Sequence, residues 1–395
     1  MQPLTINDYT LVTALGAGRA AQRRALLAGE TGLAPCRFFD ITDLPTFVGE
    51  VAGLDEVTLP TELAEFDCRN NRLAWLALQQ DGFTATVAGA ADRYGPDRIG
   101  VYVGTSTAGI HHTELAYFAR ASIDAPLPGW YRYDSTHNMY SVAEFVRLAL
   151  GLNGISMAIS TACSSSAKVF ASAERAMAGG LIDAAVVGGA DSLCLTTLYG
   201  FHSLQLVADE LCRPADAARR GLNIGEAAGF ALLERDGDPA RPKLLGYGES
   251  GDAYHMSSPC PDGAGALLAM GAALRRAALA SDDIDYINLH GTGTKTNDLA
   301  ECTAVQRLFG PRTPCSSTKG WTGHTLGAAG IVEIAFSLLA LEHGFMPQSL
   351  NTREVDPAIT CRIVTETRHA PLGRVLSNSF GFGGSNCSLI VGAGA

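Results

Sequence analysis

The 395-residue sequence predicts an α/β fold made of two similar halves. The first observation is a strand–helix–strand order over residues 155–190, which is typical of a parallel βαβ crossover. The second is that the same order returns over residues 243–289. The third is that two related stretches, GEAAGFALL and GFGGSNCSLIV, occupy similar places in the two halves, which indicates an internal duplication. We therefore expect α/β layers packed on one another.

The first half opens with an apolar strand from residue 4, a glycine turn at Gly16–Gly18 and an amphipathic helix that ends at Gly29. Pro and Asp punctuate residues 35–67, which we interpret as a surface excursion. We expect one helix over residues 69–90.

The continuous apolar run RIGVYVG at residues 98–104 predicts a buried strand. Residues 111–138 are aromatic and irregular, and a segment of this kind usually covers a site or a subunit contact.

Cys163 lies at the strand-to-helix corner of the crossover. Residues 155–159 alternate as a short buried strand, and small residues with cap formers follow up to Ser166. The Ala-rich helix then runs to Met177 and stops at Gly179-Gly180. The positive end of a helix dipole stabilises a thiolate, so we expect a nucleophilic cysteine, although a lone cysteine is more often structural.

Polar, turn-rich residues 236–242 predict the boundary between the halves. We divide the chain into residues 1–240, a half that carries the cysteine, and residues 241–395. In the second half we expect strands at 243–248 and 285–289, a helix at 264–280, a helix at 327–343 and two C-terminal strands around GFGGSN.

Composition excludes several classes of protein. A net charge of −11 and a pI near 5.3 argue against a nucleic-acid or anionic-membrane partner. We see no signal peptide and no apolar run approaching the roughly 18 residues that span a bilayer. Ten scattered cysteines without a C-x-x-C pair suit free thiols in the cytoplasm rather than disulfides or zinc. We expect no metal site, and GYGESG is not followed by the helix that a dinucleotide site needs.

Four polar segments follow predicted strands, where open α/β sheets place their sites. They are STACSSS around Cys163, HGTGTKTND from His290, STKGWTGHTLGAAGIVE from Ser317, and NSFGFGGSN from Asn378. Taken singly, each has a structural explanation: a hydrogen-bonded histidine, a solvated lysine, an ordinary ion pair or a hairpin turn. Taken together, they bring a thiol, two imidazoles and an amine to one pocket.

In this order the four segments resemble the β-ketoacyl-acyl carrier protein synthases, the elongating condensing enzymes of the thiolase superfamily. The resemblance covers nearly the whole chain. It implies a thiolase-like fold with two duplicated α/β halves in a layered αβαβα arrangement. The half at 1–240 would carry the nucleophile, and the half at 241–395 would carry both histidines, the lysine and the glycine-rich loop.

The resemblance also implies a mechanism. Cys163 takes an acyl group from the phosphopantetheine of a carrier protein, with the backbone N–H groups of Cys163 and Phe382 as the oxyanion hole. Malonyl-carrier protein then loses carbon dioxide, and His290 and His324 stabilise the enolate that attacks the acyl group. Lys319 holds the charge of this network. Phosphopantetheine arrives on the carrier protein, so no cofactor is expected.

The remaining assignments also come from the resemblance. They are Gly381 and Gly383 beside the gating Phe382; Glu333, Asp298 and Glu301 as supports; Thr292 and Thr294 for the pantetheine arm; and Thr107, Ala108 and Phe380 for the acyl pocket. This chain departs from two motifs of the family, R-P-F-D-x-x-R-D-G-F and G-E-G-A-G. The differing residues are Ala215, Arg220, Leu222 and Ala227. TACSSS and HGTGTKTND favour a specialised type II polyketide system, such as one making a polyene or an aryl polyene, over housekeeping fatty acid synthesis.

Two rival functions remain open. A non-catalytic partner subunit of the chain-length-factor type would lose the nucleophile, which this chain keeps. A Cys/His hydrolase would leave Lys319 and the second histidine unexplained. We expect an acyl carrier protein as partner and a dimer, either of identical chains or with a chain-length-factor-like paralogue. A hypothetical basic rim for the carrier protein consists of Arg69, Arg72, Arg213, Arg219 and Arg220.

Overall fold

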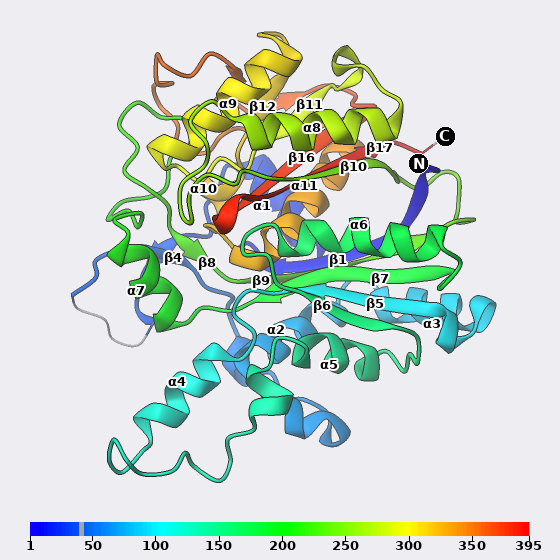
Figure 1. Cartoon of the computed structure of the whole chain (residues 1–395), viewed down its shortest axis with the longest axis vertical. Coiled ribbons are helices and arrows are strands. Elements are labelled where there is room, and N and C mark those ends of the chain that lie inside the picture. Colours follow the sequence, from blue (N-terminus) through cyan, green and yellow to red (C-terminus); the bar gives the residue numbers. More distant parts are fainter. Residues whose placement is uncertain (39–42, 395) are drawn as a thin grey trace.

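The computed structural model describes residues 1–38 and 43–394. Two mixed β-sheets lie one above the other, with helices between them and on both outer faces (Figure 1). This arrangement confirms the predicted α/β class and the αβαβα layering of two duplicated halves.

The sheet of the first half has the strand order β6-β5-β7-β9-β1. Its strands are β1 Leu4–Thr13, β5 Ile99–Gly104, β6 Ser156–Ile159, β7 Ala184–Asp191 and β9 Ala227–Glu234. Strand β5 pairs in parallel with β6 and β7, which confirms the crossover, whereas β7–β9 and β9–β1 pair antiparallel.

The sheet of the second half has the order β14-β12-β11-β16-β17-β10. Its strands are β10 Lys243–Gly251, β11 Tyr286–Asn288, β12 Pro314–Ser316, β14 Arg362–Ile363, β16 Arg374–Gly381 and β17 Ser385–Gly392. Strand β11 pairs in parallel with β12 and β16, and the antiparallel pairs β16–β17 and β17–β10 repeat the pattern of the first half.

The two sheets meet where β1 pairs with β10 over only two residue pairs, Leu4–Leu244 and Thr5–Lys243. Short strands complete the described chain: β2 Gly16–Ala17, β3 Ala34–Pro35, β4 Phe47–Gly49, β8 Ile224–Gly225, β13 Phe345–Met346 and β15 Arg368–His369. The predicted division after residue 240 falls in the connection between β9 and β10, and we retain it as a proposal.

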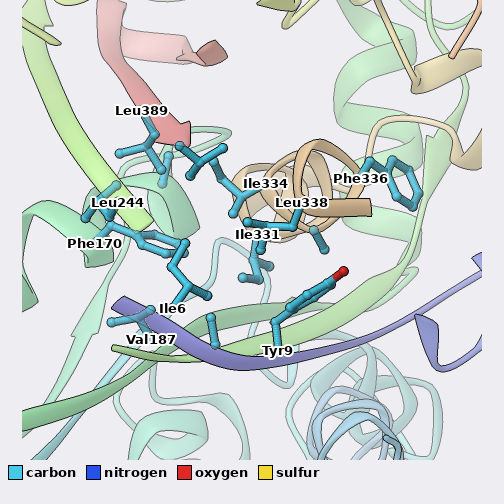
Figure 2. Close-up of a cluster of buried hydrophobic side chains, with 14 of the residues drawn as sticks. Ile6, Tyr9, Phe170, Val187, Leu244, Ile331, Ile334, Phe336, Leu338 and Leu389 are labelled. Carbon is cyan, nitrogen blue, oxygen red and sulfur yellow. The ribbon is translucent and has the colours of Figure 1, made fainter. Parts of the chain in front are cut away.

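Helices α6 (Ser165–Ala178) and α11 (Ala329–His343) lie between the sheets and contact both. Figure 2 shows α11 side chains packed among residues of both halves: Ile331, Ile334 and Leu338 with Ile6, Phe170, Leu244 and Leu389. A helix that is apolar on all sides is expected to be buried. By length and composition Leu326–His343 could cross a membrane, but 89% of it is buried inside the fold, as this rule expects of a core helix. The expectation that no apolar run reaches that length was wrong.

The outer layers are helical. Helices α8 (Ala264–Ala277) and α9 (Lys295–Phe309) cover the second sheet, and α2 (Arg69–Leu78), α3 (Phe83–Tyr94) and α5 (Ser141–Ala149) cover the first (Figure 1). The other helices are α1 Arg19–Ala28, α4 Ile110–Phe118, α7 Leu195–Ser203 and α10 Lys319–Thr322.

Four local expectations need correction. The single helix predicted at 69–90 is broken by left-handed backbone at Asp81 and Gly82 (φ 56° and 75°). The segment at 111–138 is not irregular throughout, because it contains α4 and a π-helical turn at Tyr133–His137. The excursion at 35–67 also buries apolar side chains, including Val51 and Leu54; residues 39–42 of that stretch lie outside the described residues.

The fourth correction concerns β6, which is an edge strand rather than a buried one. Ile155, which precedes it, and Met157 within it are 41% and 44% exposed. An alternating apolar pattern cannot distinguish a strand buried by its own chain from one left for another subunit.

The contact between the two central helices depends on a glycine. A Cβ atom at Gly330 of α11 would lie 2.4 Å from the backbone nitrogen of Ala167 in α6. We predict that Gly330→Ala lowers the free energy of unfolding by about 1–3 kcal/mol through overpacking.

Gly89→Ala is the matched control, because Gly89 lies in helix α3 and its Cβ would meet nothing within 4 Å. This control should gain about 0.4–1 kcal/mol. Urea unfolding of both variants measures the difference, and equal effects would contradict the close approach of α6 and α11.

Candidate active site

The four polar segments converge at the carboxyl ends of β6, β11, β12 and β16, as predicted. Sγ of Cys163 and one ring nitrogen of each of His290 and His324 lie within 4.8 Å of one another, and all three residues are buried. These side chains line a cavity together with the backbone turn at Gly381–Phe382. The thiol, both imidazoles and the glycine loop therefore share one site.

Cys163 stands just before α6, after left-handed backbone at Ala162 (φ 52°). Its Sγ lies 3.0 Å from Nε2 of His324, and the Phe382 N–H donates to it. Burial raises the pKa of the Cys163 thiol to about 12, although the Lys319 charge and the Phe382 N–H act in the opposite direction. Loss of hydration on burial thus outweighs the favourable field around the sulfur.

The second nitrogen of each imidazole accepts a hydrogen bond. The Leu326 N–H donates to Nδ1 of His324 at 3.3 Å, and Nζ of Lys319 lies 3.3 Å from Nδ1 of His290. Burial and the Lys319 charge lower the pKa of both histidines well below the ordinary value, so both rings are neutral. A neutral ring that accepts at Nδ1 carries its proton on Nε2. Both rings therefore present an Nε2–H donor to the cavity.

This protonation pattern bears on metal binding. A thiol and two imidazoles at this spacing are of the type that zinc uses. Metal-bound histidines donate their other N–H to an acceptor, whereas here both Nδ1 atoms face donors. The Nε2 lone pairs that a metal needs are thus occupied by protons.

Lys319 is buried and is paired with Glu333, as the sequence suggested. Its ammonium also donates to the backbone oxygen of His290, and Ser379 donates to Glu333 at 3.3 Å. Burial raises the pKa of Glu333 to about 7, and the Lys319 charge and hydrogen bond oppose that rise. Lys319 thus joins α11 to the His290 strand end.

Glu301 and Asp298, on one face of α9, support the loop that follows His290. Glu301 accepts the His290 N–H at 2.9 Å and the Gly291 N–H at 2.8 Å. Asp298 accepts the Gly293 N–H at 3.2 Å and forms an ion pair with buried Arg219 at 3.3 Å. Their positions agree with a bracing role.

The glycine loop brings Phe382 beside Cys163. A Cβ atom at Gly381 would lie 2.8 Å from the backbone oxygen of Thr161 and 3.2 Å from the Cys163 nitrogen, so glycine allows this close approach. Gly383 has a left-handed φ of 77°. The Phe382 ring stacks on Phe201 at 5.2 Å. Sequence reasoning missed Phe201, because nothing in the composition of α7 marks it.

The predicted pantetheine residues line the same cavity. The hydroxyls of Thr292 and Thr294 lie 2.9 Å apart, and neighbouring polar residues that sequence reasoning missed also face this space. These are Asp252, Ser257, Ser258, Thr296 and Asn297. They belong to the loop after β10 and to the first turn of α9, whose polar composition gave no sign of convergence.

The acyl-pocket residues divide into two groups. Phe380 lines the cavity, 6.0 Å from His290 between ring centres. Thr107 and Ala108 are buried in the loop after β5, where Thr107 donates to Asp191. Their contact with an acyl chain stays a prediction.

Two members of the hypothetical basic rim are buried rather than at the surface. Arg69 is buried against Glu226, and Arg219 is buried between Asp298 and Asp356. Single-sequence reasoning cannot tell a buried arginine in an ion pair from a solvated one. The remaining arginines have acidic partners as well: Arg72 with Asp67, Arg213 with Glu210, and Arg220 with Asp209 at 3.8 Å.

Comparison with known proteins adds independent information. Residues 66–238 match the model of the N-terminal domain of β-ketoacyl synthases, and residues 243–353 match that of the C-terminal domain. The chain is 33% identical to 3-oxoacyl-[acyl-carrier-protein] synthase 2 of Vibrio harveyi over 93% of this chain and 92% of the relative. It is 34% identical to nodulation protein E of Rhizobium meliloti over 74% of this chain and 75% of the relative.

Solved structures give the same picture. The ketosynthase ApeO in complex with its chain length factor ApeC, from Xenorhabdus doucetiae, superimposes with a TM-score of 0.90 at 38% identity, covering 99% of this chain and 98% of that chain. The ishigamide ketosynthase/chain length factor also gives 0.90, at 26% identity over the full length of both.

The buried Lys319–Glu333 pair allows a stability test. Lys319→Met leaves a buried carboxyl group without its cation, and we predict a loss of about 3–5 kcal/mol in the free energy of unfolding. The double variant Lys319→Met/Glu333→Leu should recover most of that loss, because neither charge remains buried.

Arg312→Met is the control, since the Arg312–Asp282 pair is exposed and should contribute less than about 1 kcal/mol. Urea unfolding measures all three variants. A double variant no more stable than Lys319→Met would show that the pair does not act as a unit.

Proposed function

The chain belongs to the β-ketoacyl synthase family, and from that membership we propose that Cys163 is its nucleophile and that His290 and His324 form its enolate-stabilising pair. Like its relatives, it is an acyltransferase of the 3-oxoacyl-acyl carrier protein synthase class and a condensing enzyme of fatty acid or polyketide chain elongation. The observation that supports the residue roles is the pair of Nε2–H donors beside one thiol.

The first step transfers an acyl group to Cys163. Sγ attacks the thioester carbon of the acyl-carrier protein, and the N–H groups of Cys163 and Phe382 stabilise the oxyanion. The C–S bond to pantetheine then breaks, and the proton of the Cys163 thiol leaves with the pantetheine sulfur. A resting thiol suits this exchange, because the proton is needed on the leaving group.

The second step makes the new carbon–carbon bond. The bond to the malonyl carboxylate breaks and releases carbon dioxide, and its electron pair forms an enolate. The Nε2–H groups of His290 and His324 donate to the enolate oxygen. The α-carbon attacks the acyl carbon, the C–S bond to Cys163 breaks, and the Sγ thiolate takes a proton from solvent to return to the resting thiol. The chain is then two carbons longer.

The rival readings fit these residues less well. A non-catalytic partner subunit has no need of a buried thiol beside two donors. A Cys/His hydrolase needs a histidine that accepts the thiol proton, whereas Nε2 of His324 already carries one.

We predict that incubation with acyl-carrier protein adds one acyl mass to the wild-type chain and none to Cys163→Ala. Intact-mass spectrometry measures the adduct. Cys36→Ser is the matched control, because Cys36 is a partly exposed cysteine away from the cavity and its loss should leave acylation unchanged. An adduct that persists in Cys163→Ala would remove Cys163 from its proposed role.

An acyl carrier protein is the proposed donor of both substrates, with phosphopantetheine as its own prosthetic group and no further cofactor. We infer that it docks near the first turn of α9, where exposed Lys295 adjoins Thr296 and Asn297 at the mouth of the cavity. The exposed side chain of Arg220 remains from the basic rim and has only a distant, exposed acidic partner. We place the reaction in the cytoplasm, where ten free thiols stay reduced.

Dimerisation through the β6 edge is a further part of the proposal. Strand β6 leaves one side unpaired in the described chain, and Ile155 and Met157 expose apolar surface there. An exposed apolar edge strand is a site for pairing with another chain. The partner is an identical chain or a chain-length-factor-like paralogue, the latter as in the ApeO–ApeC complex. The similarity to ApeO and the motifs TACSSS and HGTGTKTND together favour a specialised type II polyketide or polyene system.

We predict that Met157→Arg dissociates the dimer, because the cation would be buried between two strand edges. Light scattering after gel filtration measures the mass. Leu268→Arg on α8 is the control. It also replaces an exposed apolar side chain with arginine, and it should leave the mass unchanged. A wild-type chain that is monomeric alone and dimeric only with a paralogue identifies the heterodimer, and a monomer in both cases contradicts the proposal.

A further inference from the structure

Asp191, the last residue of β7, has a carboxylate without any exposed surface and outside the roles assigned above. In the described part of the chain its hydrogen-bond donors are all uncharged, although a buried carboxylate normally has a cation beside it. Oδ1 accepts from Thr105 Oγ1 at 2.6 Å, Ser106 N at 2.9 Å, Thr107 N at 3.0 Å and Thr107 Oγ1 at 2.9 Å. Oδ2 accepts from Ser106 N at 3.0 Å, Ser106 Oγ and Gly327 N at 2.6 Å.

The two oxygens differ in one contact. Both accept from the loop that follows β5, and Oδ2 alone also reaches the turn that follows His324, on the other half of the chain. The 2.6 Å bond from the Gly327 N–H is the shortest backbone contact of this carboxylate. Asp191 therefore ties the turn after His324 to the end of β7.

That turn is strained. Leu326 has a φ of 54°, a left-handed conformation that is rare for a residue with a side chain. Such a conformation persists only where surrounding contacts enforce it. In it, the Leu326 N–H donates to Nδ1 of His324 at 3.3 Å, while Nε2 of the same ring lies 3.0 Å from Sγ of Cys163.

We propose that Asp191 is a positioning residue that selects the protonated nitrogen of His324. By holding the Gly327 N–H, it keeps Leu326 in the left-handed conformation and its N–H on Nδ1, so that the ring proton stays on Nε2 for the enolate. The inference rests on the proposed function of His324 and adds a residue that touches neither substrate nor thiol.

The geometry points to a selective substitution. In Asp191→Asn the amide oxygen can replace Oδ1 and keep all four of its donors. The amide NH₂ then replaces Oδ2. It can donate to Ser106 Oγ, but it also faces the Gly327 N–H, and two donors cannot bond. The Gly327 N–H keeps only its longer contact, 3.3 Å to Ser106 Oγ, so the β5 loop is retained and the link from Asp191 to the His324 turn is broken.

The first readout is the protonation pattern itself, measured by ¹⁵N NMR of histidine-labelled protein, with His324→Gln to assign the signal. In the wild type we expect the proton of His324 on Nε2. In Asp191→Asn we expect a mixture of the two neutral forms. A wild-type ring protonated on Nδ1, or an unchanged pattern in Asp191→Asn, overturns the proposal.

The second readout separates the two steps of the reaction. Decarboxylation of malonyl-carrier protein needs the Nε2–H donor, so Asp191→Asn should slow it about 100-fold. Acylation of Cys163 uses backbone N–H groups and should stay within about threefold of wild type. A merely structural role would slow both steps alike.

Asp216→Asn is the matched control. Asp216 is another buried carboxylate, it accepts the backbone N–H groups of Ala218, Arg353 and Glu354, and within the described residues it forms no hydrogen bond with His324. It should leave the NMR pattern unchanged. Gly327→Ala tests the same link from the other side, since its Cβ would lie 2.7 Å from Oδ2 of Asp191. If both link variants fail to fold, a wild-type His324 ring that carries its proton on Nδ1 still overturns the proposal.

Failure here is distinguishable from failure of the proposed function. A wild-type protein that never decarboxylates malonyl-carrier protein contradicts the function, whereas the NMR comparison between wild type and Asp191→Asn still tests Asp191. Normal decarboxylation in Asp191→Asn, with an active wild type, rejects Asp191 and leaves the function intact.

Discussion

The site depends on one constraint: where two imidazole rings are buried, each must find a donor for its Nδ1 atom from the protein. Lys319 provides that donor for His290, and the Leu326 N–H provides it for His324. In water either nitrogen of a neutral ring can carry the proton. Here the surroundings decide, and both rings turn an N–H toward the thiol.

These donors in turn need support, which comes from buried acids. Glu333 balances the charge of Lys319, and Glu301 holds the backbone at His290. The duplicated topology makes this possible, because the corresponding strands of both halves end near the same place. Residues that are 127 or more positions apart in the chain thus meet without long loops.

Much of this could be predicted from the sequence. The crossover around Cys163, the repeated order of elements and the convergence of four segments all follow from strand ends meeting in an α/β sheet. The failures share a physical cause. The burial of Arg69 and Arg219 and the partner of Phe382 depend on what surrounds a side chain in space. A residue and its neighbours in the sequence do not contain that information. Asp191 escaped notice for the same reason, since its seven hydrogen bonds come from two distant segments.

The central pair of helices has a consequence for how such a chain can change over time. Helices α6 and α11 touch through Gly330, and each contacts both sheets. Either half made alone would therefore expose a large apolar surface to water. A gene split between the halves would therefore give a folded protein only if both fragments were made together. Insertions and new specificities must instead accumulate in the outer helices and connecting loops, where added chain displaces only solvent.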